Sequence, residues 1–149
     1  MTIRKLTASD ADTMQSVIHV FGEAFEDPDN YHKNPPSADY LARFLAKDHV
    51  IVLAAMDEDT VTGALVAYEL EKFEQARSEI YIYDLAVAQA HRRRGIATAM
   101  IGELQRVAAE RGAWVIFVQT DDRDPPAIAL YDKLGVREEV LHFEIPPKG

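Results

Sequence analysis

The chain has 149 residues, of which 48% are hydrophobic and 28% charged, values typical of one globular domain that needs no disulfide or metal to bury a core. Its 16 basic and 25 acidic residues give a formal charge of −9, which excludes nucleic acid and anionic membranes as expected partners. There is no cysteine, no apolar run of roughly 20 residues and no apolar stretch behind the first basic residues, so we expect a cytoplasmic protein.

The first third of the chain, after an initial strand, predicts two helices. Apolar residues recur at helical spacing over residues 10–25, and Ser9 or Asp10 can cap this helix. Residues 27–36 are rich in Pro, Asn and Asp and predict a loop. The second helix is expected over residues 37–46.

The middle of the chain predicts three strands. Residues 49–56 and 61–70 are rich in β-formers and flank an acidic turn, which together indicate a hairpin. Residues 79–87, with the sequence EIYIYDLAV, form a nearly continuous run of β-formers, typical of a strand covered on both faces.

The last third predicts helix, strand, helix and strand in turn. The expected elements are a helix over residues 96–111 ended by Gly112, a strand over 113–120, a short helix from Pro125 or Pro126 to Gly135, and a final strand over 136–145. The order β-α-α-β-β-β-α-β-α-β predicts one α/β domain over residues 1–149, with a mixed sheet in which an antiparallel meander leads into a β-α-β unit.

Residues 91–98, HRRRGIAT, lie between the strand over 79–87 and the next helix, where unpaired helix N–H groups can bind an anion. Arg92, Arg93 and Arg94 would repel the positive end of that helix dipole unless an anion binds, and Gly95 and Ala97 leave the backbone accessible. The alternative is a solvated loop whose arginines pair with carboxylates. Neither a P-loop nor a GxGxxG motif is present.

Asp84 is the single carboxylate in an otherwise apolar run, IYIYDLAV. Burying its charge is costly unless the charge is paired or neutralised, and burial would raise its pKa toward values useful for a general base. The alternative is a structural aspartate bonded to a buried arginine or hydroxyl.

With these elements in place, the chain resembles the GNAT superfamily of N-acetyltransferases. Residues 92–97 satisfy the family signature Arg/Gln-x-x-Gly-x-Gly/Ala between the fourth strand and the following helix. The resemblance implies the GNAT acyl-CoA N-acyltransferase fold, with acetyl-CoA as co-substrate. Its pyrophosphate would be held by the loop, and its pantetheine arm would add to the preceding strand. The implied binding residues are Leu85, Ala86, Val87, Arg92, Arg93, Arg94, Gly95, Ile96, Ala97 and Thr98.

A second family motif is similar to residues 127–136, and this resemblance implies Tyr131 as general acid. The family usually has Asn where this chain has Asp124, and Tyr131 could instead be a core aromatic. Acetyl transfer to an amine requires loss of an amine proton and protonation of the departing thiolate. Asp84 as base, Tyr131 as acid and a backbone N–H near Leu85 or Ala86 would supply these functions in a direct transfer.

Residues 20–27, 72–87, 91–99 and 130–145 resemble aminoglycoside 3-N-acetyltransferases. The resemblance implies acetylation of the 3-amino group of the 2-deoxystreptamine ring of gentamicin-like drugs, antibiotic resistance and a homodimer. Carboxylates are expected to bind the polycationic aminoglycoside. The candidate substrate-binding residues are Glu79, Asp84, Asp121, Glu138 and Glu139.

Two other functions fit the same residues. A GNAT enzyme could acetylate a polyamine, a peptide or another small amine through an identical CoA site. A non-catalytic acyl-CoA-binding domain would keep the arginine loop but would not need Asp84 or Tyr131. No metal is expected, because the histidines lack ligand spacing and cysteine is absent.

Overall fold

The computed structural model describes residues 1–149 and divides them into two compact units, residues 1–119 and residues 120–149. The expectation of a single domain over residues 1–149 stays a prediction.

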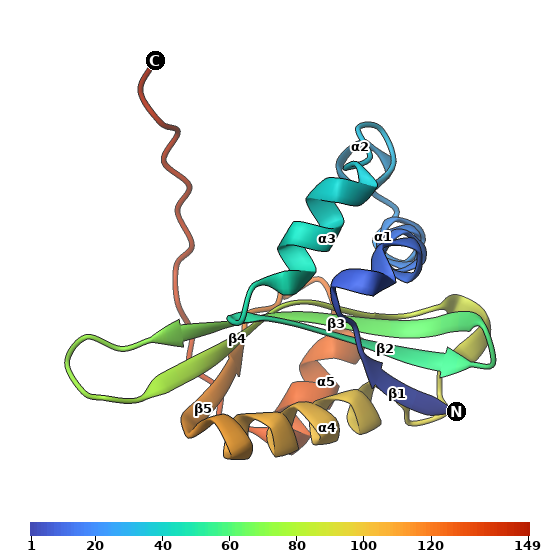
Figure 1. Ribbon diagram of the computed structural model, residues 1–149. Helices are drawn as coiled ribbons and strands as arrows, with labels where there is room; N and C mark the ends of the chain where they lie inside the picture. The colour runs from blue at the N-terminus through green and yellow to red at the C-terminus, as the bar shows by residue number, and fades with distance from the viewer. The chain divides into compact units, whose positions relative to one another are not determined.

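The larger unit contains a five-stranded sheet in the order β1-β2-β3-β4-β5 (Figure 1). Its strands are β1 (Thr2–Lys5), β2 (Val50–Asp57), β3 (Thr60–Glu71), β4 (Ser78–Val87) and β5 (Ala113–Val118). The first four strands pair antiparallel, and β5 pairs parallel with β4. The predicted mixed sheet, with an antiparallel meander leading into a β-α-β unit, is confirmed.

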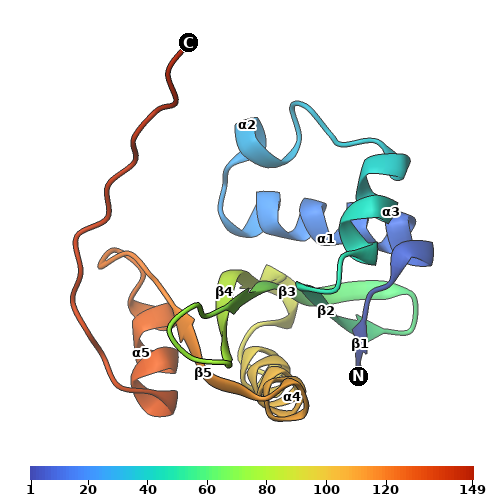
Figure 2. The ribbon, with the colours of Figure 1, turned by 60° about the vertical axis from the view of Figure 1, so that its left-hand side comes forward.

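The helices of this unit are α1 (Ala11–Ala24), α2 (Pro28–Tyr31), α3 (Ala38–Ala46) and α4 (Ile96–Arg111), with short 3₁₀ turns at Ala8–Asp10 and Gln89–His91. Helices α1 and α3 lie on one face of the sheet and α4 lies on the other (Figures 1 and 2). The helices expected over residues 10–25, 37–46 and 96–111 are therefore confirmed. The expected loop over residues 27–36 is wrong in part, because it contains α2.

Helix α2 forms because its first residues suit a helix start. The side chain of Asp27 caps it by accepting from the backbone N–H of Asn30 at 3.3 Å. Pro28 occupies the first helical position, where its missing N–H costs nothing. A helix of a single turn is too short for hydrophobic periodicity to indicate it.

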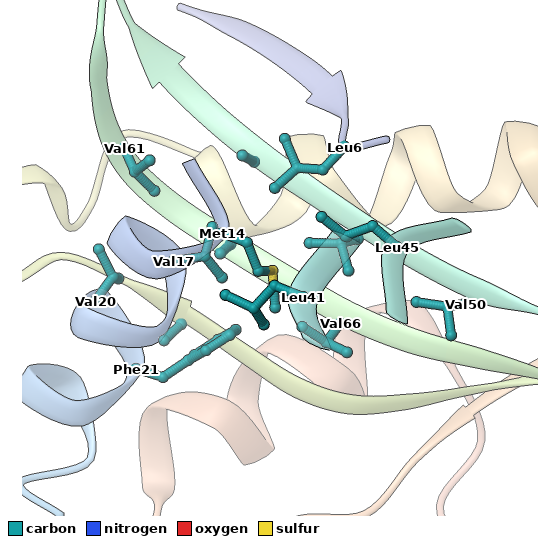
Figure 3. Packing of buried hydrophobic residues seen from close by; sticks show 14 of the residues in the cluster. Leu6, Met14, Val17, Val20, Phe21, Leu41, Leu45, Val50, Val61 and Val66 are labelled. Carbon is teal, nitrogen blue, oxygen red and sulfur yellow. The ribbon is translucent and has the colours of Figure 1, made fainter. Parts of the chain in front are cut away.

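The main core lies between the sheet and helices α1 and α3 (Figure 3). It consists of the buried residues Leu6, Met14, Val17, Val20, Phe21, Leu41, Leu45, Val50, Val52, Ala54, Met56, Val61, Ala64, Val66 and Ala86. Alternate strand residues, such as Ile51 and Leu65, point to the other face and are also fully buried, as are Met100 and Leu104 of α4. Both faces of the central strands are therefore covered.

One irregularity in β4 decides which way Asp84 points. Ala67 of β3 pairs with Ile82, but the preceding residue, Val66, pairs with Asp84, so Tyr83 is an extra residue in β4. Such a bulge reverses the alternation of side chains beyond it. Because directly paired residues share a face, Asp84 projects with Val66 toward α1 and α3. In a strand that kept Tyr83 but had no bulge, Tyr83 would pair with Val66 and Asp84 would face α4.

The smaller unit contains α5 (Pro125–Leu134), which confirms the short helix predicted there. The side chain of Asp124 caps it by accepting from the N–H of Ala127 at 3.2 Å. The family's Asn position, occupied here by Asp124, thus serves as a helix cap.

The strand expected over residues 136–145 is wrong, because these residues pair with no other strand. Their exposed apolar side chains include Val136, Val140, Leu141, Phe143 and Ile145. The composition suits a strand, but a strand forms only where its backbone finds a partner.

None of the helices combines the length and the apolar composition that a membrane span requires.

Candidate active site

The loop between β4 and α4 presents main-chain donors at the start of α4. Gly95 precedes the helix in a left-handed conformation, with φ 76°, and a Cβ there would meet nothing within 4 Å. The N–H of Ala99 bonds to the carbonyl of Gly95 at 3.0 Å, and no side chain caps the helix. The N–H groups of Ile96, Ala97 and Thr98 therefore lack partners within the helix and are available to an anion.

Arg92, Arg93 and Arg94 are exposed beside this helix start. The Nε of Arg92 donates to the carbonyl of Val87 at 3.2 Å, and Nη1 of Arg94 lies 3.1 Å from Nδ1 of His91. None of the three pairs with a carboxylate within residues 1–119. Each positive charge near a helix N-terminus costs roughly 0.3–1 kcal/mol, which a bound polyanion would reverse.

Gly63 of β3 allows α4 to start close to the sheet. A Cβ at Gly63 would lie 3.0 Å from Cγ2 of Ile96, 3.2 Å from the carbonyl oxygen of Ala86 and 3.2 Å from Cε of Met100. The absence of a side chain there places the first turn of α4 against the end of β4.

The end of β4 has one edge that β5 does not cover. Strand β5 pairs with β4 only from Ser78 to Ile82, where the partner is Val118. Residues 84–87 continue beyond this point and pair with β3 on their other side only. Leu85, Ala86 and Val87 thus lie where an extended amide chain could add to the sheet, next to the arginine loop.

Asp84 is half-buried on β4, immediately before these three residues. The hydroxyl of Tyr31 donates to its Oδ2 at 2.8 Å and is the only side chain of residues 1–119 that hydrogen-bonds to it. Burial raises the pKa of Asp84, and the hydrogen bond from Tyr31 opposes this rise. A carboxylate with a raised pKa accepts a proton more readily than a surface aspartate does. A structural aspartate bonded to a hydroxyl would show the same contact with Tyr31. Substitution of Asp84 is therefore needed to distinguish a general base from a structural residue.

Sequence reasoning missed the tyrosines that lie near Asp84. Tyr31 comes from α2, Tyr68 from β3 and Tyr83 from β4. The rings of Tyr68 and Tyr83 meet edge to face at 5.7 Å, and Tyr83 lies 5.9 Å from Tyr81. Tyr83 is 60% exposed, so its ring is accessible to a cationic ligand. Tyr83 and Tyr81 were visible in the sequence around Asp84, but no local pattern links Tyr31, which is 53 residues away.

Glu79 is not brought next to Asp84. It lies five residues earlier on β4, roughly 17 Å away along an extended strand. Its carboxylate lies 3.3 Å from Nζ of Lys72, which compensates its charge. The structure therefore places Glu79 away from Asp84, and its role as a substrate ligand stays a prediction.

The remaining candidates belong to the smaller unit. Tyr131 lies on α5, and the carboxylate of Asp121 pairs with Arg123 at 3.0 Å. Glu138 and Glu139 are exposed in the extended segment after α5. Their roles as general acid and substrate ligands stay predictions.

A scan against family descriptions matches the Acetyltransferase (GNAT) family over residues 14–136, a range that extends from the larger unit into the smaller one. An acetyltransferase of Agrobacterium fabrum is 30% identical over 105 residues, which cover 69% of this chain and 71% of that protein.

Two solved structures show the same fold over almost the whole chain. One is an aminoglycoside acetyltransferase from an uncultured soil metagenomic sample, 56% identical, with 99% of this chain and 98% of that chain covered and a TM-score of 0.96. The other, also an aminoglycoside acetyltransferase from an uncultured soil sample, was solved in complex with sisomicin. It is 28% identical, with 99% and 96% covered and a TM-score of 0.91.

Proposed function

Because the chain belongs to the GNAT family of acetyltransferases, we propose that it transfers the acetyl group of acetyl-CoA to an amino group of an aminoglycoside. The observation that carries the proposal is that an anion-binding loop and a half-buried carboxylate occur together at one end of β4. The aminoglycoside acetyltransferase that is 56% identical over 99% of this chain supports the substrate class.

The residues at the end of β4 fit acetyl-CoA, which supplies an activated acetyl group. The N–H groups of residues 96–98 and the side chains of residues 92–94 would hold the pyrophosphate. The open edge of residues 85–87 would orient the pantetheine amides. The fit rests on donors that the protein leaves without partners and on arginines that no carboxylate of residues 1–119 neutralises.

In the proposed reaction, a carboxylate oxygen of Asp84 accepts one proton from the substrate ammonium group, which frees the nitrogen lone pair to bond to the acetyl carbon. The C–N bond forms as the C–S bond breaks. Tyr131 donates a proton to the departing sulfur, and the second proton that the nitrogen loses passes to solvent, from which Tyr131 regains its own. A backbone N–H near Leu85 or Ala86 stabilises charge on the carbonyl oxygen. We further propose the 3-amino group of 2-deoxystreptamine as acceptor, a cytoplasmic homodimer and a role in gentamicin resistance, all of which rest on the sequence resemblance.

A panel of amines tests the substrate class. Release of the CoA thiol, followed with a thiol reagent, should accelerate with gentamicin or sisomicin and not with spermidine or short peptides. NMR of the product should place the new acetyl group on the 3-amino nitrogen. Faster turnover with spermidine or peptides than with either drug would contradict the assignment and favour another small-amine acetyltransferase.

Substitution of the proposed base tests the mechanism. Asp84→Asn should lower kcat by about 10²- to 10⁴-fold, the usual contribution of a general base, while calorimetry shows unchanged acetyl-CoA binding. Tyr131→Phe should reduce kcat more mildly. Asp59→Asn, in the exposed turn between β2 and β3, is the matched control and should behave as wild type. Unchanged turnover in Asp84→Asn and Tyr131→Phe would remove both residues from the mechanism.

A further inference from the structure

We propose that Tyr31 is a positioning residue for Asp84, and that α2 holds the carboxylate in one orientation toward the substrate amine. This inference rests on the proposed function, since it assigns Tyr31 a role through the proposed base. Nothing in the residues around position 31 indicates this role, which follows from the fold.

The contact itself leaves the base half engaged. The hydroxyl of Tyr31 donates to Oδ2 of Asp84 at 2.8 Å, and no other side chain of residues 1–119 donates to this carboxylate. One oxygen is therefore held by the protein while Oδ1 has no donor from the larger unit. Because the bond at Oδ2 fixes the direction of the whole carboxylate, the free Oδ1 can accept a proton from an incoming amine.

The position of Tyr31 is set by α1 and by the cap of α2. Its ring lies 6.1 Å from that of Phe21 and 5.8 Å from that of Phe25, measured between centroids. The Asp27 side chain accepts from both the backbone N–H and the side-chain amide of Asn30, at 3.3 and 2.7 Å. These contacts fix the turn that carries Tyr31.

The residue after Tyr31 adds a second constraint. A Cβ at Gly22 of α1 would lie only 2.2 Å from Nε2 of His32, so the His32 ring occupies the space that a side chain would need. The His32 ring also stacks on His19 with centroids 5.1 Å apart. Helix α2 is therefore packed closely against α1, and Tyr31 cannot withdraw from Asp84 without disturbing this packing.

The hydrogen bond also affects proton affinity. Burial is the main cause that raises the pKa of Tyr31, and the hydrogen bond to Asp84 and the charges of Asp84 and Asp27 raise this pKa further. The hydroxyl of Tyr31 therefore stays protonated and able to donate. The bond favours the charged form of Asp84 and opposes the effect of burial on its pKa. The titratable groups on which the charge of Asp84 acts are Tyr31 from α2, Tyr68 from β3 and Tyr81 from β4, and the charge of Asp27 at the cap of α2 acts on Tyr31. Loss of the hydroxyl should therefore raise the pKa of Asp84.

The test is Tyr31→Phe in the full chain, which removes the hydroxyl and keeps the ring. The titration of the Asp84 carboxyl, followed by ¹³C NMR and assigned with Asp84→Asn, should move to higher pH. The acidic limb of the kcat/KM profile should move in the same direction, so kcat/KM should fall about three- to tenfold at pH 6 and less at pH 8. The KM for acetyl-CoA should stay unchanged. Tyr40→Phe, at an exposed tyrosine of α3, is the matched control and should titrate as wild type.

An Asp84 titration that is identical in wild type and Tyr31→Phe would overturn the inference. So would a loss of activity that is equal at every pH, because a purely structural role predicts that result. In an Asp84→Asn background, Tyr31→Phe should add no further loss, and an additive loss would also contradict the coupling. The NMR titration needs no amine substrate, so failure of the aminoglycoside assignment can be told apart from failure of this inference.

Discussion

At Asp84, burial raises the pKa of the carboxyl, so its charged form is less stable in the folded chain than in water. A group with a raised folded-state pKa stabilises the fold below its unfolded pKa, and this contribution is lost as pH rises through the folded-state value. Asp84→Asn should therefore raise the thermal midpoint at pH 7, measured by circular dichroism, and the gain should shrink as pH falls toward about 4. A midpoint below wild type at pH 7 would identify Asp84 as a structural residue.

Gly95 is needed for its backbone conformation, since φ is 76° and a Cβ would meet nothing. Gly95→Ala should cost about 1 kcal/mol of stability in urea unfolding, and it should weaken acetyl-CoA binding because the loop carries the anion donors. Gly102 of α4 also has open space but an ordinary helical position, so Gly102→Ala is the control and should stabilise the chain by about 0.5–1 kcal/mol. If Gly95→Ala and Gly102→Ala changed the free energy of unfolding in the same direction, the left-handed conformation of Gly95 would not explain the need for glycine.

At the scale of elements, the end of α4 is tied to the sheet by a partly buried network. Arg111 donates to the carboxylate of Glu69 at 2.8 Å and to the carbonyl of Asp48 at 2.7 Å, and the Ser78 hydroxyl donates to Glu69 at 2.6 Å. Burial raises the pKa of Glu69, but the bonds from Ser78 and Arg111 together outweigh it and lower the pKa overall.

Because the pKa of Glu69 is lowered, its contribution to stability is present above the unfolded pKa and is lost as pH falls through the folded-state value. Glu69→Gln should lose about 1–3 kcal/mol at pH 7, the usual cost of removing a charged partner from a partly buried hydrogen bond. Urea unfolding should show the difference narrowing below about pH 4. A difference that does not change with pH would contradict this account.

The strands and the longer helices of residues 1–119 could be predicted because their apolar residues match the faces that the fold buries, as Val17 and Phe21 do on α1. The arginine loop could be found because its residues are contiguous. The extra residue Tyr83 and the contact of Tyr31 could not, since each depends on strand register or on packing between distant segments. For residues 136–145 the pattern suits a strand, but no partner strand is present.

Glu79 illustrates what a shared strand does not establish. Its position on the same strand as Asp84 suggested a shared site, but each residue of an extended strand advances the chain by about 3.4 Å. The pairing with Lys72 at the opposite end of β4 then gives Glu79 a local role. Two side chains on the same strand lie close together only when few residues separate them.

At the scale of the whole molecule, the formal charge of −9 attracts polycations over long distances. The KM for an aminoglycoside should therefore rise several-fold between about 50 and 300 mM salt, because salt screens this attraction. Thermal unfolding over the same salt range should change little and serves as the control. A KM that is independent of salt would show that the overall charge has no part in substrate capture.

The extra residue in β4 also bears on how such an enzyme can evolve. Loss of the single codon for Tyr83 would restore regular pleating, and Asp84 would then follow Ile82 directly and keep its place opposite Val66, on the side of α1 and α3. Such a loss removes the exposed ring of Tyr83 and leaves the orientation of the proposed base unchanged. Libraries of point substitutions never sample that event, so deletion scanning along this strand would show whether turnover depends on Tyr83 as well as on Asp84.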